Sequence, residues 1–121
     1  MHQGNEKYIK FNNHHEFLFA RYKELVEENY ANNLTINNYA DILNISSKTL
    51  TNITKEFVGK SASQIISERI ILETQRLLKF TSLQISEIAF RVGFEDASYF
   101  VKYFKRHAGV SPSNYRSHVE L

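Results

Sequence analysis

One pattern of small, apolar and glycine residues occurs twice in this 121-residue chain, and the duplication constrains the fold more than any other feature. The matching positions, 49 residues apart, are Ile36, Ala40, Leu43 and Ile45 in the first copy and Ile85, Ala89, Val92 and Phe94 in the second. After one extra residue the offset becomes 50, and Leu50, Ile53 and Gly59 correspond to Phe100, Tyr103 and Gly109. Such a repeat indicates one structural unit used twice.

Each copy has the features of a helix-turn-helix unit. A small residue, Ala40 or Ala89, stands where two steeply crossing helices must touch. Four residues later comes a residue that accepts a positive φ, Asn44 or Gly93, and an apolar residue then fills the corner. The alternative is that the duplicated helical hairpins only pack a core.

The whole chain is expected to be all-α, because apolar residues recur with helical spacing and strand-like alternation is missing. We expect residues 1–14 to be a disordered leader or the remnant of an upstream domain, and residues 15–121 to form one domain. Within it, the first helix-turn-helix spans about 35–59, a linker helix about 62–80 and the second helix-turn-helix about 85–109. The first helix, about 15–30, should turn an apolar stripe inward that consists of Phe17, Tyr22, Leu25, Val26 and Tyr30.

Charge is unevenly distributed along the chain. The net charge is only +2, but residues 1–45 carry 4 Lys/Arg and 6 Asp/Glu, whereas residues 46–121 carry 11 and 7. The basic part therefore coincides with most of the repeated region, as expected for binding to a polyanion. Cysteine is absent, which excludes thiolate chemistry and fits a reducing cytoplasm. No apolar run is long enough to span a membrane.

In a helix-turn-helix the second helix enters the major groove of duplex DNA, so its inner face must be apolar and its outer face short or polar. The residues expected to face base edges are Ser47, Lys48, Thr51, Asn52 and Lys55 in the first unit and Ala97, Ser98, Val101 and Lys102 in the second. Asn52 suits adenine, Lys48 or Lys102 suits guanine, and Ala97 or Val101 suits a thymine methyl group. The alternative for the polar members of this set is an ordinary solvated helix face.

Phosphate contacts are expected from amide groups at helix starts and from nearby cations. The residues assigned to them are Thr35, Ser46, Ser86, Ser111, Lys105, Arg106 and Arg116. The linker helix, taken as roughly 17 residues, is about 25 Å long, against about 34 Å between successive major-groove faces. This difference predicts either a bent duplex or the engagement of only one unit.

The chain resembles the DNA-binding domain of the AraC/XylS family of bacterial transcription regulators, most clearly in the second copy. The resemblance rests on Ile85-Ser-Glu-Ile-Ala-Phe-Arg-Val-Gly-Phe-Glu-Asp-Ala-Ser-Tyr-Phe100, Phe104-Lys105 and Gly109-Val-Ser-Pro-Ser-Asn-Tyr-Arg116, and it covers about residues 16–117. Two departures are Thr74, where a small Ala is typical, and Thr54, where an aromatic residue is typical.

The resemblance implies seven helices, sequence-specific binding to promoter DNA and, usually, activation through contact with RNA polymerase. Most members of the family also carry an effector-sensing or dimerisation domain. We therefore expect this chain to be a C-terminal fragment of a larger cytoplasmic activator that is associated with the nucleoid when bound. The acidic residues Glu24, Glu27 and Glu28 on the first helix are a candidate attachment site for the missing part.

Other classes of function fit less well. No phosphate-binding glycine loop, metal-ligand spacing or nucleophile motif occurs, so we expect no catalytic residue, no metal and no cofactor. RNA binding is disfavoured because Tyr99, Phe100, Tyr103 and Phe104 have core spacing. The remaining alternative is a protein-interaction adaptor that contacts RNA polymerase and binds DNA only weakly.

Overall fold

The helices of the computed structural model agree closely with the sequence pattern. The structure describes residues 13–119, which contain seven helices and no strand. In chain order the helices are α2 (His14–Asn29), α3 (Ile36–Ile42), α4 (Ser47–Val58), α5 (Ala62–Phe80), α6 (Ile85–Arg91), α7 (Ala97–Ala108) and α8 (Pro112–Val119). None of the described helices is both long and apolar enough to cross a membrane. The expected all-α class with seven helices is therefore confirmed.

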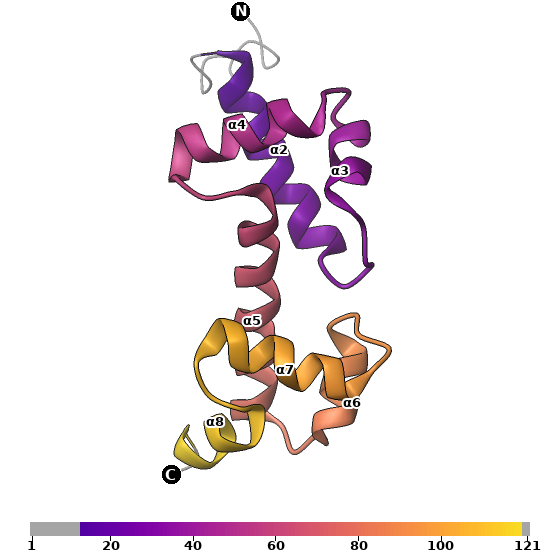
Figure 1. Cartoon of the computed structure of the whole chain (residues 1–121), viewed down its shortest axis with the longest axis vertical. Helices are drawn as coiled ribbons and strands as arrows, with labels where there is room; N and C mark the ends of the chain where they lie inside the picture. Colours follow the sequence, from indigo (N-terminus) through magenta and orange to yellow (C-terminus); the bar gives the residue numbers. More distant parts are fainter. Residues whose placement is uncertain (1–12, 120–121) are drawn as a thin grey trace, which may run out of the picture. The chain divides into compact units, whose positions relative to one another are not determined.

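The chain folds as two compact units. Within the described residues, unit 1 comprises residues 13–28 together with Leu34–Gln64, and unit 2 comprises Asn29–Asn33 and residues 65–119. Each unit contains a short helix joined by a tight turn to a longer one, α3–α4 in unit 1 and α6–α7 in unit 2 (Figure 1). Most of α5 belongs to unit 2. At 19 residues, α5 measures about 28 Å, slightly more than the sequence estimate.

The turns between α3 and α4 and between α6 and α7 have the expected backbone conformation. Asn44 has a φ of 59° and Gly93 a φ of 101°. Gly93 also has a steric reason to lack a side chain, because a Cβ atom there would lie 2.7 Å from the carbonyl oxygen of Ala31. The residues after the turns, Ile45 and Phe94, each donate a backbone N–H to the carbonyl of the small residue five positions earlier. These bonds fix the angle at which the second helix leaves the turn.

The second helix after each tight turn, α4 in unit 1 and α7 in unit 2, begins with a side-chain cap. Ser46 accepts a hydrogen bond from the Thr49 N–H at 3.0 Å, and Asp96 accepts from Ser98 and Tyr99 N–H at 2.8 and 3.3 Å. Such caps satisfy N–H groups that have no partner inside the helix. The cap defines where α4 and α7 start and therefore which side chains each helix turns outward.

The first helix differs from expectation at both ends. Phe17 is 36% exposed, and Leu18 and Phe19 are buried instead. The reason is helical spacing, since Phe17 shares its face with residues 21, 24 and 28, which are polar. At the other end Tyr30 lies beyond α2, and its ring is covered by the Arg69 guanidinium at 4.5 Å within unit 2.

Residues 1–14 were expected to be a disordered leader or the remnant of an upstream domain. Residues 1–12 lie outside the described part of the chain; Asn13 directly precedes α2, which begins at His14. The Asn13 side chain accepts a hydrogen bond from the Glu16 N–H at 2.8 Å, which is the geometry of a helix cap.

The two departures from the family pattern are accommodated inside the units. Thr54 and Thr74 are both fully buried. The Thr54 hydroxyl donates to the Thr51 carbonyl at 3.0 Å, and the Thr74 hydroxyl donates to the Ile70 carbonyl at 2.8 Å. Each hydroxyl therefore finds a partner on its own helix, so neither leaves a buried polar group unsatisfied.

Candidate nucleic-acid interface

Helix α4 has one buried face and one polar face. Leu50, Ile53 and Thr54 are fully buried in unit 1. The residues assigned to base contacts lie on the other side of the helix: Lys48, Asn52 and Lys55 are exposed, and Ser47 and Thr51 are half-buried. This division follows from the position of the buried residues along α4, since a helix turns about 100° per residue.

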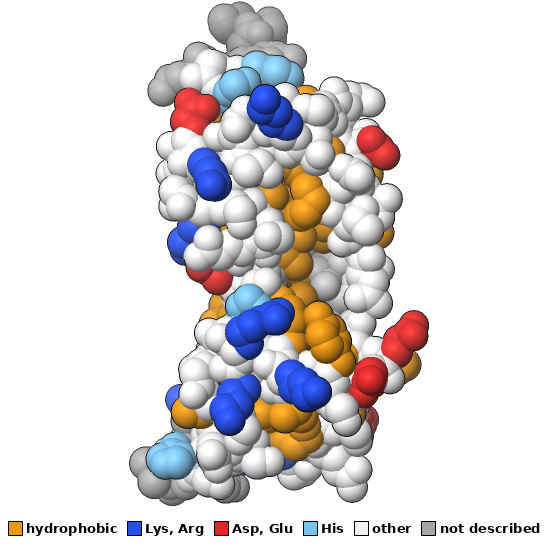
Figure 2. Space-filling model, viewed as in Figure 1, with side chains coloured by type: hydrophobic (Ala, Val, Ile, Leu, Met, Phe, Trp, Pro, Cys, Tyr) orange, Lys and Arg blue, Asp and Glu red, His pale blue; other side chains and the backbone are white. Residues whose placement is uncertain are grey.

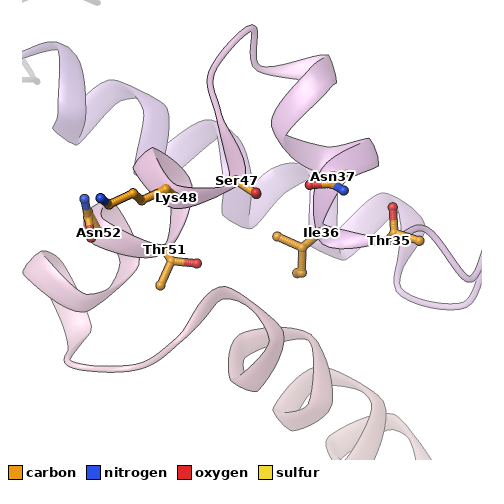
Figure 3. Close-up of a pocket in the computed structure, with 7 residues that line it drawn as sticks. All are labelled: Thr35, Ile36, Asn37, Ser47, Lys48, Thr51 and Asn52. Carbon is orange, nitrogen blue, oxygen red and sulfur yellow. The ribbon is translucent and has the colours of Figure 1, made fainter.

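An open hollow of about 480 Å³ lies beside this polar face. Its lining residues come from the start of α3 and from α4: Thr35, Ile36, Asn37, Ser47, Lys48, Thr51 and Asn52. In Figure 3, Lys48 and Asn52 extend from the same side of α4, and Ile36 at the start of α3 points towards Thr51 of α4. Four of the five expected base-contacting residues of unit 1 and one expected phosphate-contacting residue, Thr35, thus come together.

Two lining residues were missed in the sequence, Ile36 and Asn37. Asn37 occupies the position that corresponds, 49 residues later, to Ser86, which was assigned to phosphate contact. The internal repeat therefore contained the signal for Asn37.

Helix α7 repeats the arrangement in unit 2 with different side chains. Phe100 and Phe104 are fully buried, Ser98 and Lys102 are exposed, and Ala97 and Val101 are half-buried. Lys105 and Arg106 are exposed in the next turn, and basic side chains gather over α7 in Figure 2. The outward face of α7 is thus more basic and more aliphatic than that of α4.

An aromatic row borders the outward face of α7. The rings of Phe94, Tyr99 and Tyr103 contact one another. The centroids of the His107 and Tyr103 rings lie 4.5 Å apart. Tyr99 is 53% exposed, so the expectation that all four aromatic residues of this segment lie in the core was wrong for Tyr99. It was misassigned because residues 99 and 103 lie at the edge of the buried face, on the side away from Ala97.

Tyr103 is anchored to α5. Its hydroxyl donates to the Ser67 hydroxyl at 2.7 Å, and burial raises the pKa of the Tyr103 phenol. Partial burial lowers the pKa of the neighbouring His107, and the positive charge of Arg106 acts in the same direction. His107 is therefore expected to be neutral near pH 7, which leaves Lys102, Lys105 and Arg106 as the cations of this face.

The cations at the centre of each outward face are available to a ligand. Within residues 13–119, no carboxylate lies within ion-pair distance of Lys48, Lys55 or Lys102. An exposed cation without a partner retains its charge for attraction to phosphate or to base acceptors.

The serine and threonine residues assigned to phosphate contact differ in their position at the helix starts. Thr35, Ser46 and Ser111 cap α3, α4 and α8, with their side-chain oxygens accepting from N–H groups three residues on. Ser86 does not begin a helix: α6 starts at Ile85, and Gln84 is its cap residue without a side-chain hydrogen bond. Ser86 is nevertheless exposed in the first turn of α6.

Arg116 has a different place from the one expected. Its guanidinium is directed into unit 2 and donates to the carbonyl groups of Leu77, Leu78, Thr81 and Leu83, at 2.7–3.4 Å. These carbonyls lie at and beyond the C-terminal end of α5, where carbonyl groups run out of partners within the helix; the Leu77 carbonyl also accepts from the Thr81 N–H. The assignment of Arg116 to phosphate contact is therefore corrected, because its donors already serve this helix end.

Comparison with known proteins agrees with the geometry. A family model described as a helix-turn-helix domain matches residues 39–118. The transcriptional activator AarP of Providencia stuartii is 32% identical over 91 residues, which cover 75% of this chain and 67% of AarP. The C-terminal domain of AraT, a response regulator of Geobacillus stearothermophilus, superposes with a TM-score of 0.81 at 30% identity, covering 86% of this chain and 87% of that one. The chain belongs to the AraC/XylS family of bacterial transcription regulators.

Membership of this family establishes a DNA-binding helix-turn-helix domain of a transcription regulator, and the family and fold are those of DNA-binding regulators and not of enzymes. The Msm operon regulatory protein of Streptococcus mutans is 33% identical over 98 residues, which cover 81% of this chain but only 35% of that protein. The chain thus spans about a third of the length of this AraC/XylS relative.

Proposed function

We propose that this AraC/XylS domain reads promoter DNA through both α4 and α7, each placed in the major groove, so that two successive groove segments are contacted. The observation that carries the proposal is the duplication of one surface. In each unit a capped helix buries its apolar side and turns short or polar side chains outward. An adaptor that binds only protein has no need for two copies of this surface.

The side chains of unit 1 favour hydrogen-bonded readout of bases. We assign Asn52 to the N6 and N7 atoms of adenine and Lys48 to guanine acceptors, with Ser47, Thr51 and Lys55 beside them. The hollow next to α4 supports this assignment, because it leaves room for base edges beside Thr51 and Asn52.

The side chains of unit 2 favour a mixture of apolar and electrostatic contacts. Ala97 and Val101, both half-buried, suit thymine methyl groups, whereas Ser98 and Lys102 are exposed for polar contact with base edges. Lys105 and Arg106 continue the exposed face towards the C-terminal end of α7, where we assign them to phosphate.

Further phosphate contacts are proposed at the starts of the helices. Thr35, Ser46 and Ser111 mark three such starts, and Ser86 lies in the first turn of a fourth helix. Backbone N–H groups at these places, together with the helix dipole, favour an anion. At about 28 Å, α5 is still shorter than the roughly 34 Å that separates equivalent groove faces, so binding by both units should bend the duplex.

The wider role follows from the family and from the relatives. AarP is a transcriptional activator, and we propose activation with RNA polymerase as a protein partner. We also propose that the full-length protein carries an effector-sensing or dimerisation domain and works in the cytoplasm, bound to the nucleoid. The relative lengths support this, since the chain spans 35% of the Msm operon regulatory protein.

The proposal is tested by measuring the affinity for a promoter duplex against salt concentration, with a footprint of the same complex. We expect a steep loss of affinity with salt and protection of two segments about one helical turn apart. Lys105→Ala should reduce the salt slope by about one, because one phosphate contact is lost. Lys79→Ala, which removes an exposed lysine of α5, is the matched control and should leave the slope unchanged. Weak retention on duplex DNA, independent of salt, would instead support the adaptor.

A further inference from the structure

An apolar groove on α5, inside unit 2, belongs to neither DNA-reading surface. It is lined by Leu72, Phe80 and Tyr115, with the charged residues Arg69, Glu73, Arg76 and Lys79 among its other lining residues. Leu72 is 61% exposed and Phe80 is 70% exposed. Large apolar side chains gathered in an exposed groove, with charged residues around them, are typical of a site that binds another molecule.

The groove opens on the side of α5 away from α7. The residues of α5 that pack against Phe100 and Phe104 in the core are Ile70, Leu77 and Leu78. Leu72, Arg76 and Lys79 follow one another at spacings of four and three residues, so they share the opposite face of the helix. A duplex held by the outward face of α7 therefore leaves this groove open to another molecule.

The charge around the groove is positive. Arg76 donates to both carboxylate oxygens of Glu73, at 2.9 and 2.8 Å, and Arg69 lies 4.0 Å from the same carboxylate. Lys79 lies over the Phe80 ring, with its Nζ atom 5.3 Å from the ring centroid. Two arginines thus lie beside one carboxylate, and Lys79 adds a third cation, so positive charge exceeds negative charge beside this apolar surface.

We propose that this groove docks an acidic, amphipathic segment of a protein partner. The apolar side chains of the segment lie on Leu72 and Phe80, and its carboxylates meet Arg76 and Lys79. The apolar floor argues against nucleic acid, whose binding surfaces are rich in donors to phosphate and sugar. Opposite charges at the edge of an apolar contact also select the partner by disfavouring basic segments.

The test is a selection of 12-residue peptides from a random displayed library against the full chain. We expect the enriched peptides to share Asp or Glu together with Leu or Phe. Their binding should weaken about tenfold or more in the Leu72→Ser and Lys79→Glu variants, because an apolar anchor or a complementary charge is lost. Helical content, measured by circular dichroism, shows that each variant is folded. Lys102→Glu, an equal charge reversal on α7, should leave peptide binding unchanged.

Several results would overturn the proposal. Enrichment of basic or uncharged peptides would contradict the charge argument. If no peptide is enriched more strongly on the wild-type chain than on the Lys79→Glu variant, the groove has no peptide ligand. Competition by an excess of promoter duplex would place the peptides on the DNA-reading faces. If the chain self-associates through Leu72, its mass in solution doubles and the peptides no longer bind. That result would identify a second copy of the chain as the occupant.

Discussion

The turn at Gly93 gives the sharpest test of the helix-turn-helix geometry in unit 2. Its φ is 101°, and an added Cβ atom would lie 2.7 Å from the Ala31 carbonyl oxygen and 3.0 Å from the Ala31 carbonyl carbon. Ordinary van der Waals contact begins at 3.4 Å, and the atoms in the way belong to backbone. Gly93→Ala must therefore displace either the turn or the segment Asn29–Asn33 that packs on it.

The size of the effect can be separated into two parts with Gly109→Ala as the control. Gly109 also belongs to unit 2 and has a φ of 88°, but nothing lies within 4 Å of its added Cβ atom. Alanine at a positive φ costs about 1–2 kcal/mol, of which about 0.4–1 kcal/mol is recovered through the lower entropy of the unfolded chain. The collision at Gly93 adds about 1–3 kcal/mol, which is the usual cost of overpacking.

The assay is urea unfolding followed by helical circular dichroism. We expect Gly93→Ala to lower the free energy of unfolding of unit 2 by about 1–3 kcal/mol more than Gly109→Ala does. Equal losses in the two variants would refute the reasoning, since they would leave only the backbone strain that both positions share. A stabilised Gly93→Ala variant would show that Ala31 does not pack against the turn.

Three further predictions concern stability. Arg116→Lys should lower the free energy of unfolding by about 1–3 kcal/mol, because a lysine cannot donate to four carbonyls at once. Unchanged stability together with weakened DNA binding would instead indicate that Arg116 contacts phosphate. Burial raises the pKa of the Tyr22 phenol, so the unfolded chain ionises first and stability should fall as the pH rises above about 10. Tyr22→Phe should make this alkaline decline shallower, and an identical decline measured by urea unfolding at several pH values would contradict the assignment. Ser46→Ala should cost about 1 kcal/mol through loss of the cap on α4, measured in the same way, and no cost would mean that the Thr49 N–H is satisfied otherwise.

Much of the fold could be predicted because the duplicated residues have few structural alternatives. A positive φ at Asn44 and Gly93 and caps at Ser46 and Asp96 are local properties, and each is present in the structure. The boundaries of the outward faces of α4 and α7 follow from helical spacing once the buried residues are known. These features were therefore accessible from the sequence alone.

The errors arose where the environment of a side chain depends on distant parts of the chain. Arg116 lies in a basic, exposed-looking segment, and only the fold brings the end of α5, 38 residues earlier, within reach of its guanidinium. Tyr99 has the spacing of a core residue, yet it lies at the edge of the buried face and remains half-exposed. The groove around Leu72 and Phe80 was likewise hidden, because apolar residues on a helix are ordinarily assigned to the core.

The most direct test of the central claim is a selection of bound duplexes from a random pool, performed with the wild-type chain, Asn52→Ala and Lys102→Ala. If both α4 and α7 read bases, each variant should lose preference at one position, and the two positions should lie about 10 base pairs apart. Each loss should correspond to about 1–3 kcal/mol of discrimination. Uniform weakening on all sequences by either variant, or loss of preference at the same position in both, would contradict reading by two helices.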